Sequence, residues 1–395
     1  MEAVFKYKGI EEAVRRIVDE GIENGTSDIH WERQPGEGLV IRYRLDGELE
    51  KVELAEEFFE GIKVISHIKI LSRMNIDEKR MPQDGRMSWS YKDKKYDIRV
   101  SSLPTVNGEN LVLRILDRED LNLDIKELGF CDTEWEIVEM LLKKANGLVL
   151  VTGPTGSGKT TTLYSALNFR SQFHDKIVTV EDPIEYEFNH FAQIPVRTQI
   201  GMTFGNALRA ILRQSPNTIM IGEIRDKETA QIAINAALTG HLVLSTLHAN
   251  DALSVMDRLK DFGLEIYQIA AALQGVIAQK LVRRLCEFCK EKYVPTDEAL
   301  ASLGFINENT EESVFYTAKG CKKCRQTGFR GRLALFEILP ITQELREVMG
   351  TGLNPIELKN NAKNLKWFCM KEHGRKRVLQ GLTTIDEILA NVMSN

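Results

Sequence analysis

Features that would place a protein in a membrane, outside the cell or on nucleic acid are missing from this 395-residue sequence. No apolar run approaches the ~20 residues that a membrane-spanning helix needs. The N-terminus begins with an amphipathic pattern rather than a charged and then apolar signal segment, so we expect the chain to stay in the cytoplasm. The net charge of -5 gives no overall attraction to nucleic acid or anionic lipid, although local basic patches remain possible.

Cysteine is scarce, and six cysteines in a chain of this length do not form a disulfide framework. The sequence also has no internal repeat and no low-complexity tract. What remains is an ordinary composition, with 43% hydrophobic and 28% charged residues. Together with the length, this composition predicts two or three globular domains that each bury a core.

The sequence is organised around a glycine-rich stretch at residues 153–160, Gly-Pro-Thr-Gly-Ser-Gly-Lys-Thr. It follows the apolar run 147–152 and leads into residues 161–167, so we expect a buried strand, a turn and a helix in this order. In that setting backbone N–H groups surround the phosphates of a nucleotide, Lys159 reaches the terminal phosphates, and Thr160 offers its hydroxyl to Mg2+. A chance glycine-rich turn is disfavoured because strand and helix both flank the motif. The residues expected to bind nucleotide are Gly153, Pro154, Thr155, Gly156, Ser157, Gly158, Lys159, Thr160 and Thr161.

Residues 1–116 are predicted to form a separate α+β domain, because helical and strand-like periodicities alternate there without a phosphate loop. The charged segment 117–127 has no clear period and is interpreted as a linker. The expected elements of the domain are helices over 9–24 and 58–74, and strands over 27–32, 39–44, 86–92 and 95–102, with a tight turn at 46–47.

From residue 128 the pattern changes to helices alternating with short, continuously apolar strands, which are typical of a mostly parallel sheet buried on both faces. We therefore predict an α/β nucleotide-binding core over 128–284, a cysteine-containing element over 285–340 and a helical region over 341–395. The expected core strands are 147–152, 176–180, 218–221 and 242–247, with helices around 207–212 and 228–237.

Two acidic clusters follow predicted strands, Glu-Asp-Pro-Ile-Glu at 181–185 and Gly-Glu-Ile-Arg-Asp at 222–226. In a parallel sheet the carboxyl ends of strands share the edge that carries the phosphate loop, so both clusters can reach a γ-phosphate. Nucleotide hydrolysis needs a carboxylate to orient water and an acid to hold Mg2+ or its waters. The alternative is that both clusters are ordinary solvated charges in loops. Their position directly after apolar strands disfavours this interpretation.

Two histidines, His241 and His248, bracket the predicted strand 242–247. A histidine at such a strand end could read the γ-phosphate, but a single histidine is more often structural, and residue chemistry leaves both roles open.

Four cysteines form two C-x-x-C pairs, Cys286 with Cys289 and Cys321 with Cys324. Two such pairs can supply four thiolates to a tetrahedral Zn2+ with no open coordination position, which predicts a structural zinc site. Four reduced cysteines or a redox pair are the alternatives. The other two cysteines, at 131 and 369, have no partner pattern.

The order of these motifs resembles the Walker A, Asp box, Walker B and His box of the secretion-superfamily ATPases, the hexameric motors of type II secretion, type IV pili and DNA-uptake pili. Upstream, Ser-Asp-Ile-His at 27–30, Gln-Asp-Gly-Arg at 83–86, and Pro104-Thr105 with Gly108-Glu109 resemble the family's second N-terminal domain. The resemblance covers nearly the whole chain. It implies an α/β fold with a RecA-like P-loop core, a smaller PAS-like α+β domain and a C-terminal zinc-binding and helical region.

The resemblance also implies roles for individual residues. Glu185 becomes the general base that orients water, Glu223 supports Mg2+ and its waters, and His241 and His248 couple the nucleotide state to domain movement. Arginines of the N-terminal domain complete the phosphate site, and the candidates are Arg86 and Arg99, followed by Arg42, Arg44 and Arg114. Glu181 and Asp182 are expected to support the reacting groups.

Two departures from the family pattern stand out. Ser-Pro-Asn at 215–217 replaces the usual Asp-Pro-Asp before the Walker B strand, which puts a detail of the site in doubt. The chain also begins directly at the second N-terminal domain, so it is either naturally short or truncated. The four cysteines are shared with assembly and secretion ATPases and are generally lacking in retraction ATPases, which points to an extension motor.

The resulting expectation is a cytoplasmic Mg2+-dependent ATPase, a homohexameric ring at the inner face of the cytoplasmic membrane under an inner-membrane platform protein. Its cofactors would be ATP, Mg2+ and Zn2+, and direct contact with nucleic acid is not expected. A DNA-uptake pilus motor or a nucleic-acid translocase is one alternative, which the acidic balance and the lack of a basic, aromatic stripe disfavour. A scaffold that binds ATP without turnover is another, which the two glutamates disfavour.

Overall fold

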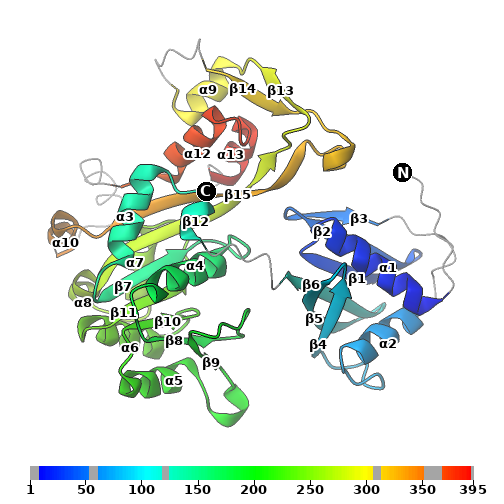
Figure 1. Ribbon diagram of the computed structural model, residues 1–395, viewed down its shortest axis with the longest axis horizontal. Coiled ribbons are helices and arrows are strands. Elements are labelled where there is room, and N and C mark those ends of the chain that lie inside the picture. The colour runs from blue at the N-terminus through cyan, green and yellow to red at the C-terminus, as the bar shows by residue number, and fades with distance from the viewer. Residues whose placement is uncertain (1–8, 53–60, 118–123, 306–312, 351–366, 393–395) are drawn as a thin grey trace. The chain divides into compact units, whose positions relative to one another are not determined.

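The computed structural model divides into two compact units, Met1–Leu121 and Asn122–Asn395 (Figure 1). The division falls within the segment interpreted from sequence as a linker. The described residues are 9–52, 61–117, 124–305, 313–350 and 367–392.

The N-terminal unit contains one six-stranded antiparallel sheet with the strand order β3-β2-β1-β6-β5-β4. Residues of α1 and α2 form a core with one face of this sheet, around the fully buried Ile17, Trp31, Ile68 and Ile98. The elements are α1 (Ile10–Glu23), β1 (Asp28–Gln34), β2 (Gly38–Leu45), β3 (Glu48–Lys51), α2 (Gly61–Leu71), β4 (Gln83–Tyr91), β5 (Lys94–Thr105) and β6 (Gly108–Asp117).

The elements predicted for this unit are present, with two differences. The helix predicted from residue 58 begins at Gly61 among the described residues, because 53–60 lie outside them. Strands β3 and β6 were not predicted, although β6 lies between β1 and β5.

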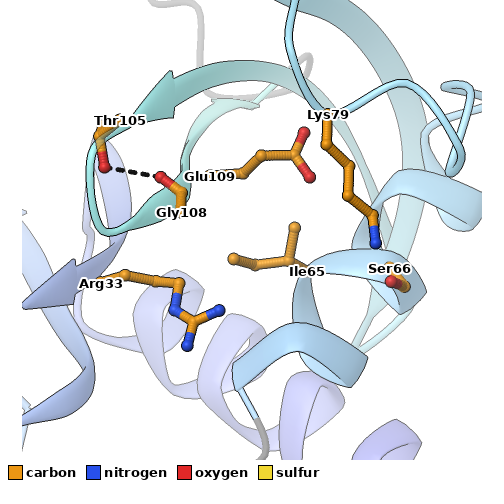
Figure 2. A pocket seen from close by; sticks show the side chains of 7 residues that line it. All are labelled: Arg33, Ile65, Ser66, Lys79, Thr105, Gly108 and Glu109. Carbon is orange, nitrogen blue, oxygen red and sulfur yellow. Dashed lines mark hydrogen bonds between the residues drawn. The ribbon is translucent and has the colours of Figure 1, made fainter.

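A cavity of about 140 Å3 lies beside α2 in this unit (Figure 2). Its wall includes Glu109, whose carboxylate accepts a 2.6 Å hydrogen bond from Lys69 Nζ and a 3.0 Å bond from the Ser102 hydroxyl. Lys69 is 1% exposed and Glu109 is 8% exposed, so the two residues form a buried ion pair. The remaining lining residues are Arg33, Ile65, Ser66, Lys79, Thr105 and Gly108.

The C-terminal unit is built on a seven-stranded sheet with the strand order β15-β12-β7-β11-β10-β8-β9. All neighbouring strands are parallel except β15, which pairs antiparallel with β12. Its strands and α-helices are α3 (Asp132–Leu142), β7 (Gly147–Thr152), α4 (Lys159–Ser171), β8 (Ile177–Glu181), β9 (Ala192–Pro195), α5 (Phe204–Ile211), β10 (Thr218–Ile221), α6 (Lys227–Leu238), β11 (Leu242–Leu247), α7 (Ser254–Asp261), α8 (Ile266–Ala272), β12 (Leu273–Leu285), β13 (Lys290–Tyr293), α9 (Asp297–Leu303), β14 (Phe315–Ala318), β15 (Phe329–Pro340), α10 (Gln343–Gly350), α12 (Met370–Leu379) and α13 (Ile385–Val392). Short 3-10 turns are η2 (Ile125–Leu128), η3 (Thr198–Ile200), η4 (Leu212–Gln214) and η5 (Lys322–Cys324).

The central strands form because both of their faces are buried. On β7, Leu148 and Leu150 join the core that contains α6 and α8, whereas Val149 and Val151 join the core that contains α3 and α4. Helices therefore cover both faces of the sheet, which is the α/β architecture expected from the unbroken apolar runs.

The cysteine-containing element is smaller than the segment 285–340 predicted for it. Its last 12 residues, Phe329–Pro340, are β15, which pairs along β12 and belongs to the main sheet. What remains is the two-stranded sheet β13–β14, which lies beside α9, α12 and α13 (Figure 1). The predicted helical region contains α10, α12 and α13, and residues 351–366 and 393–395 lie outside the described ones. Among the described helices, none is both long enough and apolar enough to cross a membrane.

Candidate active site

The glycine-rich stretch forms the turn between β7 and α4, as its sequence context predicts. Gly153, Gly156 and Gly158 have φ angles of 141°, 78° and 85°, in the region that favours glycine. The loop leaves the carboxyl edge of the parallel sheet, where β8, β10 and β11 also end. Side chains that follow these strands therefore lie at the same edge as the loop.

Lys159 is held over the loop by its own backbone. Its Nζ donates to the carbonyl oxygens of Gly153 at 2.8 Å and Pro154 at 2.9 Å. Burial lowers the pKa of Lys159, and the nearby Glu223 carboxylate opposes this shift. The ammonium is thus available to a phosphate bound in the loop.

The loop residues also fit an anionic ligand by a second criterion. The Ser157 hydroxyl is buried and has no hydrogen-bond partner, which is unusual for a buried polar atom. Together with the loop N–H groups and the start of a 13-residue helix, this arrangement suits nucleotide phosphates. Thr160 and Glu223 provide the hard oxygen donors that Mg2+ prefers.

Glu223 lies at the centre of a charged group at this edge. Its carboxylate, 16% exposed, forms an ion pair with Arg225, and His248 Nε2 lies 3.6 Å from Oε2. Arg225 also lies 3.8 Å from Asp182, which connects the two acidic clusters. The structure thus places Glu223 and His248 together at the phosphate-loop edge.

Glu181 is a buried structural carboxylate rather than a group open to substrate. It accepts hydrogen bonds from the hydroxyls of Tyr164 and Thr179, the latter at 2.6 Å, and from Gln193 Nε2 at 3.1 Å. Burial and the Glu181 charge raise the pKa of Tyr164. The Tyr164 oxygen accepts a hydrogen bond from the backbone N–H of Glu185 at 3.3 Å. Glu181, by binding Tyr164 of α4, therefore helps to hold the segment that contains the proposed base, Glu185. Sequence reasoning missed Tyr164 and Gln193, since neither belongs to a motif.

The two histidines lie at opposite ends of β11, and only His248 is at the end next to the phosphate loop. This corrects the expectation that His241 could read the γ-phosphate. Strand β11 runs parallel to β7, so His248 follows the end that pairs with Thr152, whereas His241 precedes the end that pairs with Gly147. Six residues of strand separate them by about 20 Å. His241 Nδ1 contacts the carbonyl oxygen of Ala236 at 3.0 Å. Within one chain His241 therefore cannot contact a phosphate in the loop, and its coupling role remains a prediction.

The Ser-Pro-Asn departure at 215–217 also lies at the far edge. Asn217 accepts a 2.8 Å hydrogen bond from the backbone N–H of Lys176 and a 3.1 Å bond from that of Leu242. It therefore joins the amino ends of β8 and β11. Within the chain, this departure therefore lies away from the phosphate loop.

Four of the five candidate arginines form one row across the N-terminal sheet. Reading across β2, β1, β6, β5 and β4, the directly paired residues are Arg44, Asp28, Arg114, Arg99 and Arg86. Directly paired residues of an antiparallel sheet point to the same face. Asp28 accepts from Arg114 at 2.9 Å and lies 3.7 Å from Arg44.

This arginine row lies on the face of the sheet away from the helices, because the alternate residues Ile29, Ile98 and Leu113 are buried in the core. The remaining candidate, Arg42, forms an ion pair with Glu32. The row places four guanidinium groups on this face, and two of them, those of Arg44 and Arg114, lie against Asp28.

The four predicted zinc ligands converge. Their sulfur atoms lie within 4.8 Å of one another, with Sγ–Sγ distances of 4.0 Å for Cys286 and Cys321, 3.6 Å for Cys289 and Cys324, and 3.6 Å for Cys321 and Cys324. Tetrahedral zinc with bonds of about 2.3 Å needs sulfurs about 3.8 Å apart, so the set fits zinc.

Backbone N–H groups support the thiolate form of Cys324. Those of Cys321 and Gly328 donate to Cys324 Sγ at 3.1 and 3.2 Å. Although burial acts in the opposite direction, these N–H groups lower the pKa of Cys324 to about 6. A thiolate is the form that binds a metal ion.

A second cluster, Cys131, Glu134 and His373, joins α3 to α12 and does not suit a metal. His373 Nε2 accepts from Arg377 Nε at 2.8 Å, and Nδ1 lies 3.2 Å from Glu134 and 3.3 Å from the N–H of Phe336. Both ring nitrogens are therefore engaged, and a guanidinium touches the ring. Burial lowers the pKa of His373 to about 3, so this cluster is a neutral-histidine contact between helices.

Comparison with known proteins identifies the family of the chain. A family model described as "Type II/IV secretion system protein" matches residues 6–390. The chain is 42% identical over 376 residues to type II secretion system protein E of Pseudomonas aeruginosa, covering 95% of this chain and 74% of that protein. It is 40% identical to the type II secretion system ATPase E of Vibrio cholerae over 376 residues, with 95% and 74% covered. It is 41% identical over 380 residues to the type IV pilus assembly ATPase PilB of Thermus thermophilus, covering 96% of this chain and 42% of that protein.

Solved structures share the fold. The pilus retraction motor PilT with bound ADP aligns with a TM-score of 0.64 at 26% identity, with 96% of both chains covered. The ATPase DotB of Legionella pneumophila aligns with a TM-score of 0.68 at 21% identity, with 100% of this chain and 98% of that chain covered, which supports the fold alone.

Proposed function

The chain belongs to the type II/IV secretion system protein family, and on this basis we propose that it is a Mg2+-dependent ATPase that powers pilus assembly or pseudopilus extension. The names of its relatives support ATPase activity in secretion or pilus assembly. The single observation that carries the proposal is the proximity of the Glu223 carboxylate to Lys159 of the glycine-rich loop, with the Glu185 segment held on α4, the helix that follows the loop.

In the proposed reaction, loop N–H groups and Lys159 hold the phosphates of ATP. Mg2+ bound by Thr160 and Glu223 would neutralise the phosphate charge. Glu185 orients a water molecule and accepts its proton as the water oxygen attacks the γ-phosphorus and the bond to the ADP oxygen breaks. His248, which lies next to Glu223, would register the presence of the γ-phosphate.

The N-terminal unit would supply the remaining positive charge. Arg86 and Arg99 lie in the arginine row, which presents guanidinium groups to one face of the sheet. When these groups approach the bound triphosphate, domain closure becomes coupled to the nucleotide state. A homohexameric ring, acting against a platform protein at the inner face of the cytoplasmic membrane, would turn such closures into the addition of pilin subunits. Binding to the platform protein would place the ATPase at the membrane.

The proposed zinc site supports an extension motor rather than a retraction motor. The four cysteines converge with a geometry that suits zinc, and the family resemblance connects such cysteines with assembly and secretion ATPases.

Phosphate release by the purified chain tests the catalytic assignment. Glu223→Gln and Glu185→Gln should each lower the rate by about 10²-fold or more while ADP still binds, because each removes one carboxylate from catalysis. Glu187→Gln, a change at an exposed neighbour of Glu185, is the matched control and should keep the wild-type rate.

Two outcomes would replace the proposal. Equal and slow phosphate release by the wild type and Glu223→Gln would favour an ATP-binding scaffold. Strong stimulation by added DNA would favour a nucleic-acid translocase.

A further inference from the structure

Strand β12 reaches the phosphate loop from the side. It pairs in parallel with β7 as far as Ala278 and Thr152, the last residue of β7. The next residue of β12, Gln279, therefore lies beside the loop where it leaves the sheet. Gln279 is 1% exposed, although its side chain is polar.

The amide of Gln279 is hydrogen-bonded on both sides. Its Nε2 donates to the carbonyl oxygen of Ser157, and its Oε1 accepts from the hydroxyl of Thr162 at 2.7 Å. A carbonyl oxygen can only accept, so the NH2 group must face the loop and the amide oxygen must face Thr162. The amide thus ties the loop to the first turn of α4.

The backbone of the loop is packed against the same residue. A Cβ atom at Gly153 would lie 2.2 Å from the carbonyl oxygen of Gln279, and one at Gly158 would lie 3.1 Å from its Nε2. Two of the loop glycines are therefore required by the close approach of Gln279 as well as by their φ angles.

The direction of the bond to Ser157 has a consequence for the next N–H group. Across a planar trans peptide, the C=O of Ser157 and the N–H of Gly158 point in opposite directions. Because Gln279 draws the carbonyl toward β12, the Gly158 N–H points away from β12. In the part of the chain that the structure describes, this N–H makes no hydrogen bond, and N–H groups of such a loop are the ones that bind phosphate oxygens.

We propose that Gln279 is a positioning residue for nucleotide binding, which holds the peptide between Ser157 and Gly158 in the orientation that presents the Gly158 N–H to the phosphates. Thr162 supports this role by fixing the orientation of the amide. The inference rests on the nucleotide binding proposed above and assigns part of it to a residue outside the glycine-rich motif.

Gln279→Met in the full chain tests the proposal, because methionine has a similar length but no amide. Affinity for fluorescently labelled ADP should fall about 10-fold or more, and the KM for ATP should rise in parallel. The reason is that the Gly158 N–H would no longer be held in place for its charge-assisted hydrogen bond to a phosphate oxygen. The control is Gln274→Met, which removes another amide from β12, one that accepts a hydrogen bond from Arg346 away from the loop. This control should keep the wild-type affinity.

A second pair of variants separates positioning from packing. Thr162→Val removes the hydroxyl that fixes the amide and should also weaken ADP binding, whereas Thr162→Ser keeps a hydroxyl and should preserve it. The double variant Gln279→Met/Thr162→Val should bind ADP no more weakly than Gln279→Met, because both changes act through the same amide.

Several results would overturn the inference. ADP affinity of Gln279→Met within twofold of wild type, with only a lower melting temperature, would leave Gln279 a packing residue. If Gln279→Met does not fold, unchanged ADP affinity of Thr162→Val contradicts the proposal equally well. A wild-type chain that does not bind ADP would instead refute the proposed function.

Discussion

Arg86 on β4 lies directly opposite Arg99 on β5, so two like charges face each other on neighbouring strands. Arg99 in turn pairs with Arg114 on β6. Like charges directly opposite each other destabilise a sheet, and an anion bound at this face would relieve the repulsion.

Arg86→Gln should therefore raise stability and lower activity together. The melting temperature at low salt should increase, corresponding to about 0.2–1 kcal/mol of relieved repulsion. The ATPase rate should fall about 10-fold or more if the arginine row stabilises the negative charge of the phosphoryl group in the transition state. Thermal unfolding and phosphate release measure the two effects. Arg80→Gln, at an exposed arginine bonded to Glu78, is the control, and an unchanged rate for Arg86→Gln would remove Arg86 from the site.

Tyr164→Phe should disturb the proposed base without touching substrate. The change leaves the buried Glu181 with one donor fewer and removes the acceptor of the Glu185 N–H. An unfolding free energy lower by about 1–3 kcal/mol and a reduced kcat are expected, because a buried carboxylate loses a partner. Denaturant unfolding and steady-state kinetics provide the measurements, with Tyr267→Phe at an exposed tyrosine as the control. Wild-type stability would show that the hydrogen bond to Glu181 contributes nothing.

Zinc removal should unfold the cysteine element locally. Metal analysis should give one zinc per chain, and Cys324→Ser should reduce this value and lower the melting temperature, because a four-cysteine site depends on each ligand. Cys369→Ser, at a cysteine outside the cluster, should retain the metal. A value well below one zinc per wild-type chain would contradict the assignment.

The buried His373 should make stability fall in mild acid. Its pKa is lowered to about 3 in the folded chain by burial, with Arg377 and Lys376 adding to the effect, whereas an unfolded histidine titrates near ~6.5. Below pH 6.5 the unfolded chain therefore binds one proton more, and the stability contributed by neutral His373 is lost progressively as the pH falls toward 3. Burial raises the pKa of the neighbouring Glu134, and this shift acts in the opposite direction, since it makes the folded chain bind a proton more readily in acid.

Comparison with His373→Asn isolates this effect. Between pH 7 and pH 5 the wild type should lose about 2 kcal/mol of unfolding free energy relative to the variant. Denaturant unfolding at each pH measures the difference, and His190→Asn, at an exposed histidine, should leave the slope unchanged. Parallel pH profiles for the wild type and His373→Asn would refute the prediction.

The core strands were predictable because each is a short apolar run that ends at the sheet edge. The predicted runs 147–152, 218–221 and 242–247 coincide with β7, β10 and β11. The antiparallel pair β12 and β15 was missed, because charged residues such as Lys280 and Arg283 interrupt its apolar pattern.

The groups at the phosphate-loop edge were predictable only where a motif follows a strand. Glu223 and His248 were found in this way, but His241 was misplaced because residues that bracket one strand must lie at its opposite ends. Gln279 and Thr162 are 117 residues apart in sequence, and no local pattern connects them. Contacts of this kind arise from sheet order, which a single sequence does not reveal.

Strand β12 does more than complete a sheet. From Gln279, beside the phosphate loop, it continues for six residues to Leu285, and Cys286 follows directly. At ~3.3 Å per residue, this short extended segment spans about 23 Å between the residue proposed to position the loop and a proposed zinc ligand. A reporter group placed at the exposed Phe288 of the cysteine element would therefore be joined to the loop side of the sheet by one continuous strand, β12. Its signal would report, from outside the active site, whether nucleotide binding at the loop changes the surroundings of the cysteine element.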